Sequence, residues 1–151
     1  MEPNEKKNPK GRVIGIDLGL KRVGLSISDD LGVFAHPLTT IYYKNQTQVL
    51  EEVMELAVEH QARGFVVGVP KNMDGTLGES ARRSLRFARK LESRSDLPVI
   101  LWDERLTTSQ AEKEMIGLGK SRRKRKSGID EAASVLILEN YLRSVADIEQ
   151  E

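Results

Sequence analysis

The chain has 151 residues, enough for one domain with a single core, and 38% of them are hydrophobic, which is typical of a folded protein. Its 24 basic and 23 acidic residues give a formal net charge of +1, so only local clusters of charge can indicate a partner. The absence of cysteine excludes disulfides and thiolate metal sites, and two histidines are a poor basis for zinc. Metals that prefer oxygen ligands, such as magnesium and manganese, remain open.

The sequence shows neither a membrane-spanning segment nor a secretion signal. No apolar run approaches the ~20 residues that a membrane span needs. Residues 1–11 are polar and lack the apolar region of a signal peptide. We therefore expect a cytoplasmic protein with no membrane contact, built as a single domain over 12–145 between flexible tails at 1–11 and 146–151.

The first predicted element is a β-hairpin. Residues 13–16 are apolar with little alternation, as in a strand that is covered on both faces. After a turn that contains glycine, Val23, Leu25 and Ile27 alternate as a second strand. Asp17 lies near the end of the first strand, where a buried carboxylate needs a cation, hydrogen-bond donors or water. The alternative is that Asp17 only accepts hydrogen bonds within the turn.

The elements that follow change from strand to helix periodicity. Residues 38–43 predict a third strand, and three short strands in succession favour an antiparallel meander. Further along we expect helices over 46–62 and 79–92, strands over 65–69 and 99–102, a helix capped by Thr107, and a last helix over 129–143. Strands flanked by helices are typical of a parallel half-sheet. The sequence therefore predicts an α/β fold in which a five-stranded mixed sheet, three strands antiparallel and two parallel, has helices on both faces.

Three separated carboxylates are candidates for a metal site. Glu104 directly follows a buried strand, and ligands collect at the carboxyl ends of parallel strands. Asp103 is a reserve candidate because it should point the other way, and Arg105 is alternatively the partner of a local ion pair. Asp130, near the start of the last helix, is either a helix cap or a carboxylate that faces the sheet. If Asp17, Glu104 and Asp130 converge on one edge, they supply what two magnesium ions require to hydrolyse a phosphodiester.

A basic segment precedes the last helix. Between Lys120 and Lys126 six of the seven residues are cations, and glycines flank them. We interpret this segment as a flexible loop that binds a nucleic-acid backbone, the alternatives being a solvated loop or a nuclear localisation signal. A second basic stripe on the helix predicted over 79–92 either extends this surface or is a solvated helix face. Its members are Arg82, Arg86, Arg89 and Lys90.

Four segments together resemble the YqgF/RuvX family, whose members are described as Holliday junction resolvases or pre-16S rRNA nucleases. In chain order they are GIDLGLKRVG (15–24), VGVPKNMDG (67–75), DERLTT (103–108) and IDEAA (129–133). The resemblance covers residues 12–143. Two departures stand out. Leu20 lies where a small hydroxyl residue is common, and Ser127-Gly128 replaces a basic and aliphatic lead into Asp130.

The resemblance implies a ribonuclease H-like fold and phosphodiester hydrolysis that depends on Mg²⁺ or Mn²⁺. It implies Asp17, Glu104 and Asp130 as the catalytic residues and metal ligands. The residues expected to bind the nucleic-acid substrate are Lys21, Arg22, Asn72, Arg105, Arg122, Arg123, Lys124, Arg125 and Lys126.

We expect a nuclease, monomeric or homodimeric, that trims the 5′ end of precursor 16S ribosomal RNA. The nearest alternative is an endonuclease that resolves Holliday junctions, which must cut two strands in register and usually acts as a symmetric dimer. A non-catalytic RNA-binding factor of ribosome assembly is a second class. A third class, the sugar-kinase or actin-like ATPases, pairs two such domains, whereas 151 residues supply one.

Overall fold

A mixed sheet forms the centre of the protein. The computed structural model describes residues 8–106 and 122–150; for 106, 122–130 and 147–150 it describes the backbone only. The strands are β1 (Val13–Leu18), β2 (Arg22–Ser28), β3 (Ala35–Tyr42), β4 (Gly64–Val69) and β5 (Val99–Asp103). They lie in the order β3-β2-β1-β4-β5. The first three pair antiparallel, while β4 is parallel to both β1 and β5. The predicted antiparallel meander of three strands and the two further parallel strands are thus confirmed.

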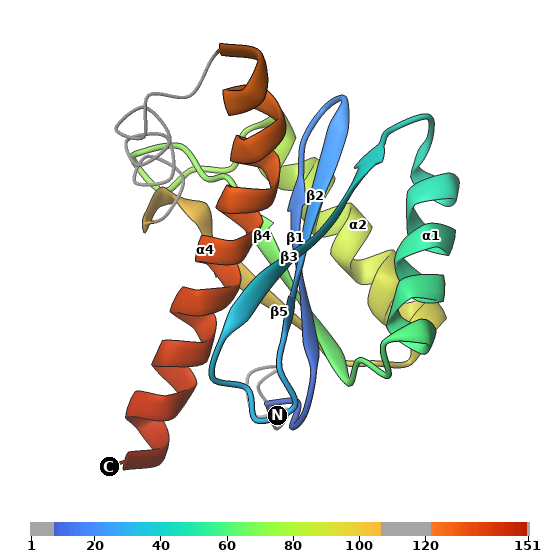
Figure 1. Ribbon diagram of the computed structural model, residues 1–151. Helices are drawn as coiled ribbons and strands as arrows, with labels where there is room; N and C mark the ends of the chain where they lie inside the picture. Colours follow the sequence, from blue (N-terminus) through green and yellow to red (C-terminus); the bar gives the residue numbers. More distant parts are fainter. Residues whose placement is uncertain (1–7, 107–121, 151) are drawn as a thin grey trace.

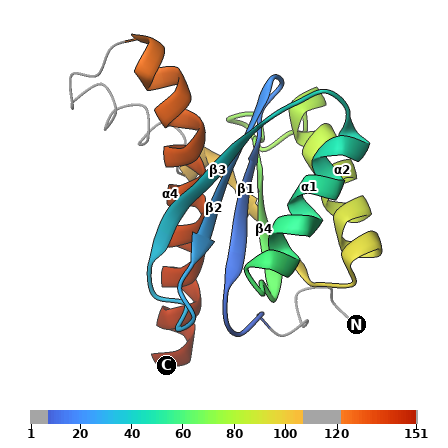
Figure 2. The same cartoon turned by 45° about the vertical axis from the view of Figure 1, so that its right-hand side comes forward.

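Helices cover both faces of this sheet. Figures 1 and 2 show α1 (Gln46–Glu59) and α2 (Glu79–Ser95) on one face and α4 (Arg122–Gln150) on the other. The alternation of side chains divides β1 between two cores. Ile14, Ile16 and Leu18 pack toward α1 and α2, whereas Val13 packs with residues of α4. Since successive strand residues point to opposite faces, Gly15 and Asp17 share the α4 face with Val13.

The two helices of the first face begin and end on local signals. Asn45 and Gln48 form a capping box at the start of α1, because each side chain bonds the backbone of the other residue. Val49, Leu50 and Val53 are buried one to two turns further on, against the sheet. The helix α2 ends at Asp96, which adopts a left-handed conformation. None of the described helices is long and apolar enough to span a bilayer.

The last helix is longer than the sequence predicts. It begins at Arg122 rather than near residue 129, so the basic residues 122–126 lie in a helix and not in a flexible loop. Arginine and lysine are good helix formers, and the cost of Gly128, about 1 kcal/mol, does not stop the helix. Asp130 is therefore inside the helix, and its interpretation as a helix cap is wrong. The helix predicted from Thr107 lies outside the described residues.

The ends of the domain also differ from the expected tails. Residues 146–150 continue α4, which packs on the core as far as Val145. At the other end, the Tyr141 hydroxyl donates a hydrogen bond to Asn8 Oδ1 at 3.1 Å. Pro9 lies directly against Gly64, where a Cβ atom would approach it to 2.8 Å. The chain is thus held to the domain from Asn8 onward.

Candidate active site at the carboxyl ends of β1, β4 and β5

The helix α4 packs directly against β1 at Gly15, which has no side chain. A Cβ atom there would lie 3.0 Å from Leu138 Cβ and 3.2 Å from the Ser134 carbonyl oxygen. The Ser134 hydroxyl donates a hydrogen bond to the Gly15 carbonyl at 2.9 Å. Ser26 on β2 donates in turn to the Ser134 carbonyl, also at 2.9 Å. These buried hydrogen bonds fix the register of α4 on the strand that carries Asp17.

Asp17 lies two residues beyond Gly15, near the end of β1. It is half-buried, and its backbone carbonyl accepts a hydrogen bond from the Gly19 N–H at 3.2 Å. In the sheet it stands opposite Gly24, which stands opposite Thr40, so the three form one row across β1, β2 and β3. Thr40 donates a hydrogen bond to Glu131 Oε2 of α4 at 3.0 Å. The helix therefore crosses the row of Asp17 at residue 131.

Glu104 comes from the other half of the sheet. It opens a short 3-10 helix, η2 (Glu104–Leu106), directly after β5, and only 6% of its surface is exposed. Its side chain lies over Gly68 of β4, where a Cβ atom would be 2.8 Å from both Glu104 Cγ and Cδ. Val67 pairs with Ile16 of the parallel strand β1, so Gly68 stands beside Asp17. Glu104 thus lies on the α4 face, over the position next to Asp17.

The register of α4 brings position 130 to the same edge. At about 100° per residue, this position lies on the helix about 20° from Ile137 and about 40° from Ser134. Ile137 faces Gly68 of β4, and Ser134 contacts Gly15 of β1. Position 130 also adjoins Glu131, which marks the row of Asp17. Its backbone therefore stands over the carboxyl ends of β1 and β4, while its side chain lies outside the described set.

Within the described side chains no three acidic or histidine residues form a group that could hold a metal ion. The described part of the site consists of Asp17 and Glu104, and position 130 is the predicted third ligand. The three predicted acids share one sheet edge by strand register and helix position. Asp103 does not belong to this group.

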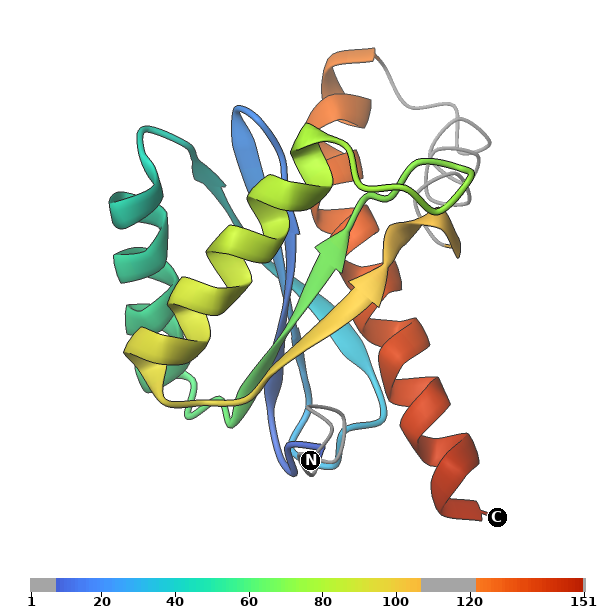
Figure 3. The same ribbon diagram turned by 180° about the vertical axis from the view of Figure 1, so that it is seen from behind.

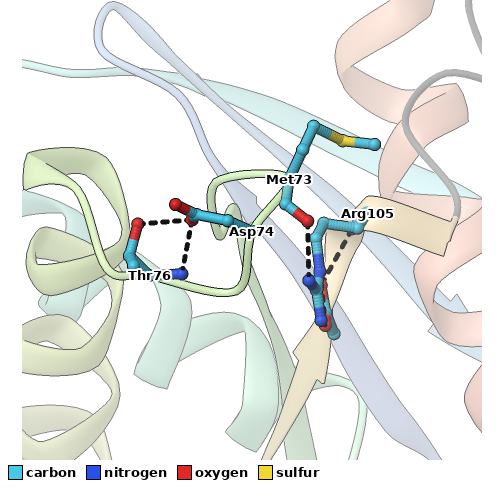
Figure 4. A network of polar contacts seen from close by, with 5 residues as sticks. Met73, Asp74, Thr76 and Arg105 are labelled. Atoms are coloured by element: carbon cyan, nitrogen blue, oxygen red, sulfur yellow. Dashed lines mark hydrogen bonds and ion pairs between the residues drawn. The ribbon is translucent and has the colours of Figure 1, made fainter.

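Asp103 faces away from Glu104 and is bound by Arg105. The Arg105 guanidinium donates to Asp103 Oδ2 from Nε at 2.9 Å and from Nη2 at 2.6 Å. Its Nη1 reaches across to the Met73 carbonyl at 3.3 Å, as Figure 4 shows. The local ion pair considered for Arg105 is thus present. Its guanidinium connects the end of β5 to the loop that follows β4.

That loop, residues 70–78, is closed by its own polar side chains. Asn72 Nδ2 donates to Thr76 Oγ1 at 2.9 Å. The Thr76 hydroxyl donates to Asp74 Oδ1 at 2.7 Å, as Figure 4 shows. The hydrogen bonds from Thr76 lower the pKa of Asp74. Gly75 has a φ of +88°, a conformation that favours glycine. Asn72, predicted to bind substrate, therefore uses one amide donor to shape the loop.

The Arg105–Asp103 pair predicts a pH effect. The hydrogen bond from Arg105 lowers the pKa of Asp103 below its ordinary value. The stability that the pair contributes is then fully present above the unfolded pKa, about 3.9, and is lost as the pH falls through the lower folded pKa. We expect the difference in unfolding free energy between wild type and Asp103→Asn to stay constant from pH 7 to 5 and to shrink below about pH 4. Urea unfolding across this range measures it, and a difference that grows in acid would contradict the assignment.

The hairpin that carries Asp17 is held by a residue that the sequence analysis did not single out. Arg83 of α2 donates from Nη1 to the carbonyl oxygens of Gly19 at 2.9 Å and Leu18 at 3.3 Å. Its guanidinium also stacks over the Tyr43 ring, with 4.6 Å between Cζ and the ring centroid. The sequence does carry a signal, because Arg83 is on the same helix stripe as Phe87 and Leu91, which are buried. An arginine in a core stripe needs acceptors.

Replacing Arg83 with alanine should therefore loosen this hairpin. The substitution removes two hydrogen bonds to the backbone and a cation–π interaction, so we expect the free energy of unfolding to fall by about 2 kcal/mol. Arg89→Ala is the matched control, since Arg89 is exposed on the same helix, and should change stability by less than about 0.5 kcal/mol. Equal effects of the two substitutions in urea unfolding would contradict the role of Arg83.

The predicted cationic residues lie at the same end of the molecule. Lys21 is exposed in the β1–β2 turn, and its carbonyl accepts the Tyr43 N–H at 2.9 Å. Arg22 follows at the start of β2 and is half-buried. Figures 1 and 3 show that α4 also begins at this end, so the backbone of 122–126 is on the side of the β1–β2 turn.

A mixed sheet in this order, with an acidic residue on its central strand and one helix across the acidic face, defines a ribonuclease H-like domain. Solved structures share the fold. The RuvC protein of T. thermophilus in complex with Holliday junction substrate aligns with a TM-score of 0.55 at 16% identity, over 89% of this chain and 96% of its own. The yeast mitochondrial Holliday junction resolvase Ydc2 aligns with a TM-score of 0.59 at 14% identity, over 98% and 84%. The predicted fold class is confirmed.

The chain belongs to the RuvX family, whose model, described as Holliday junction resolvase, matches residues 11–144. A relative from Listeria monocytogenes serotype 4b (strain CLIP80459), named "Putative pre-16S rRNA nuclease", is 49% identical over 133 residues, 87% of this chain and 96% of its own. A relative of the same name from Geobacillus sp. (strain WCH70) is 47% identical over 135 residues, 88% and 98% of the two chains. The predicted family is thus confirmed, and the prediction of a nuclease agrees with these names.

Proposed function

We propose that this protein is a metal-dependent nuclease that acts in the cytoplasm on the 5′ end of precursor 16S ribosomal RNA. The observation that carries the proposal is the buried carboxylate of Glu104, which lies over Gly68 and beside the position of Asp17. The relatives named for pre-16S rRNA support this choice of substrate, because they share nearly half of their residues with this chain over almost their whole length.

The donor set fits a hard divalent cation. Asp17 supplies carboxylate oxygens from the end of β1 and Glu104 from η2 directly after β5, and Asp130 is the third ligand that we propose from its helix position. Magnesium and manganese favour such oxygen ligands and need neither histidine nor cysteine. When bound, two such ions activate a water molecule and stabilise the leaving oxygen of a phosphodiester. The protein's own part is to hold the carboxylates at one edge and the nucleic-acid strand across them.

We propose that cations around this edge bind the phosphate backbone. Lys21 and Arg22 border it from the β1–β2 hairpin, and the basic residues 122–126 border it from the start of α4. Asn72 borders it from the loop after β4, and Arg105 borders it from η2 after β5. Because Asp103 engages the Arg105 guanidinium, the main effect of Arg105 is to fix that loop beside the substrate.

Resolution of Holliday junctions is the second candidate, favoured by the description of the matching family model. The two functions differ in substrate and in oligomeric state, because a resolvase must cut two strands in register. The deciding experiment incubates purified protein with RNA that carries the 16S 5′ leader and with four-way DNA junctions, each with Mg²⁺ and with Mn²⁺. Light scattering gives the mass in solution.

We expect a monomer that shortens the RNA at its 5′ end and leaves the junction intact. A dimer that cuts the junction symmetrically would instead establish the resolvase. Cleavage of neither substrate would overturn the nuclease proposal and leave an RNA-binding factor of ribosome assembly as the remaining interpretation.

A further inference from the structure

We infer that Gly68 is a positioning residue for Glu104: the space left by its missing side chain is where the Glu104 carboxylate lies, so strand β4 sets where Glu104 meets a divalent cation. The inference deepens the proposed function and rests on it, because it takes Glu104 as a metal ligand. Gly68 itself touches neither metal nor substrate.

The strand itself gives no reason for a glycine. All six residues of β4 are buried. Apart from Gly68, the strand positions on its two faces include the valines Val66, Val67 and Val69. Such a central strand favours β-branched residues, and a glycine in it often marks a close approach of another group. At Gly68 that group is identified, because a Cβ atom would lie 2.8 Å from Glu104 Cγ and Cδ and 2.7 Å from Ile137 Cδ1.

Of the two neighbours, Glu104 is the one that can yield. Ile137 is fully buried in the core that α4 forms with Val13 and Val66, and close packing leaves such a side chain little freedom. The backbone at Glu104 is fixed on the other side by the Arg105–Asp103 pair. An added methyl group at Gly68 would therefore turn the Glu104 side chain about its own bonds. That movement takes the carboxylate away from the position beside Asp17.

Gly15 shows the contrast. A Cβ atom there would meet the Ser26 hydroxyl most closely, and also the Ser134 carbonyl of the α4 backbone and Leu138 Cβ, the last two of which cannot turn aside. A methyl group at Gly15 therefore displaces the helix, whereas one at Gly68 displaces a carboxylate. The two glycines permit close approaches with different consequences, and only that of Gly68 acts directly on the Glu104 carboxylate.

The test measures Mn²⁺ affinity by isothermal titration calorimetry, together with RNA cleavage. We expect Gly68→Ala to bind Mn²⁺ about 10-fold or more weakly, the range seen when a group that orients a ligand is changed. Gly78→Ala is the matched control. A Cβ atom at Gly78 would lie 3.5 Å from Asn72 Oδ1, an ordinary van der Waals distance, so its Mn²⁺ affinity should equal that of the wild type.

A double-mutant cycle separates positioning from general damage to the fold. If Gly68 acts through Glu104, the variant Gly68→Ala/Glu104→Gln should bind Mn²⁺ no more weakly than Glu104→Gln alone. Losses that multiply would overturn the inference. Should Gly68→Ala not fold, the same cycle is measured in an Ile137→Val background, which removes the Cδ1 atom and leaves only the conflict with Glu104.

The failure of the inference and that of the proposed function give different results. A wild type that binds no Mn²⁺, or a Glu104→Gln variant that binds it equally well, would overturn the role of Glu104 as a metal ligand. A Glu104→Gln variant with weakened affinity beside a Gly68→Ala variant that matches the wild type would overturn only the role of Gly68.

Discussion

Replacing Glu104 with glutamine should reduce the cleavage of precursor 16S rRNA by about 10³-fold or more, equivalent to about 4 kcal/mol of transition-state stabilisation. The side chain keeps its size and its place over Gly68, but the amide loses the negative charge that holds a divalent cation. Since only 6% of the Glu104 surface is exposed, water cannot readily take over its role as a ligand. Single-turnover cleavage with saturating Mn²⁺ measures the effect.

Asp17→Asn should cause a loss of similar size, and the double substitution should add little to either. Residues that hold the same ions act as a unit, so their effects on the rate are not additive. Asp30→Asn is the control, because Asp30 is exposed in the β2–β3 connection and pairs with Arg12 at 2.6 Å, away from the site. It should cleave at the wild-type rate. Full activity of Glu104→Gln or Asp17→Asn would contradict the proposed site.

The sheet could be predicted because its signals are local. The alternation in β2 and the continuous apolar run in β4 each depend on neighbouring residues. The ends of α4 could not be predicted in this way. Gly128 and a run of charges are typical of a loop, whereas α4 runs through them and packs on β1 and β2 further along, through Ser134.

The candidate site could be predicted in part for the same reason. Asp17 and Glu104 stand out because each is a carboxylate at the end of an apolar strand. Gly68 does not stand out, because its effect is the space it leaves for the side chain of Glu104, 36 residues further along the chain. Arg83 acts on carbonyl groups 64 and 65 residues away in the chain. Interactions of this kind depend on tertiary structure, which no local pattern encodes.

Replacing the basic residues 122–126 with glutamine should weaken RNA binding and flatten its dependence on salt. Stability of the helix does not explain these five cations, because the dipole at a helix N-terminus disfavours positive charge. Each cation that no longer neutralises a phosphate of a single strand lowers the slope of log K against log salt by about 0.7, so replacing all five lowers it by up to about 3.5. We choose glutamine because its helix propensity is close to that of arginine and lysine, whereas serine, another polar replacement, would weaken the helix.

Fluorescence anisotropy with labelled leader RNA at about 50 to 200 mM salt measures this slope. Over that range the wild type should lose up to about 10²-fold more affinity than the variant, the ratio that a slope difference of about 3.5 gives. The control replaces Arg82, Arg86 and Arg89 with glutamine on the exposed side of α2, where Arg86 is 3.0 Å from Glu79. It alters net charge in the same direction on the far side of the sheet from α4. If both variants flatten the slope equally, net charge and not the start of α4 binds the RNA.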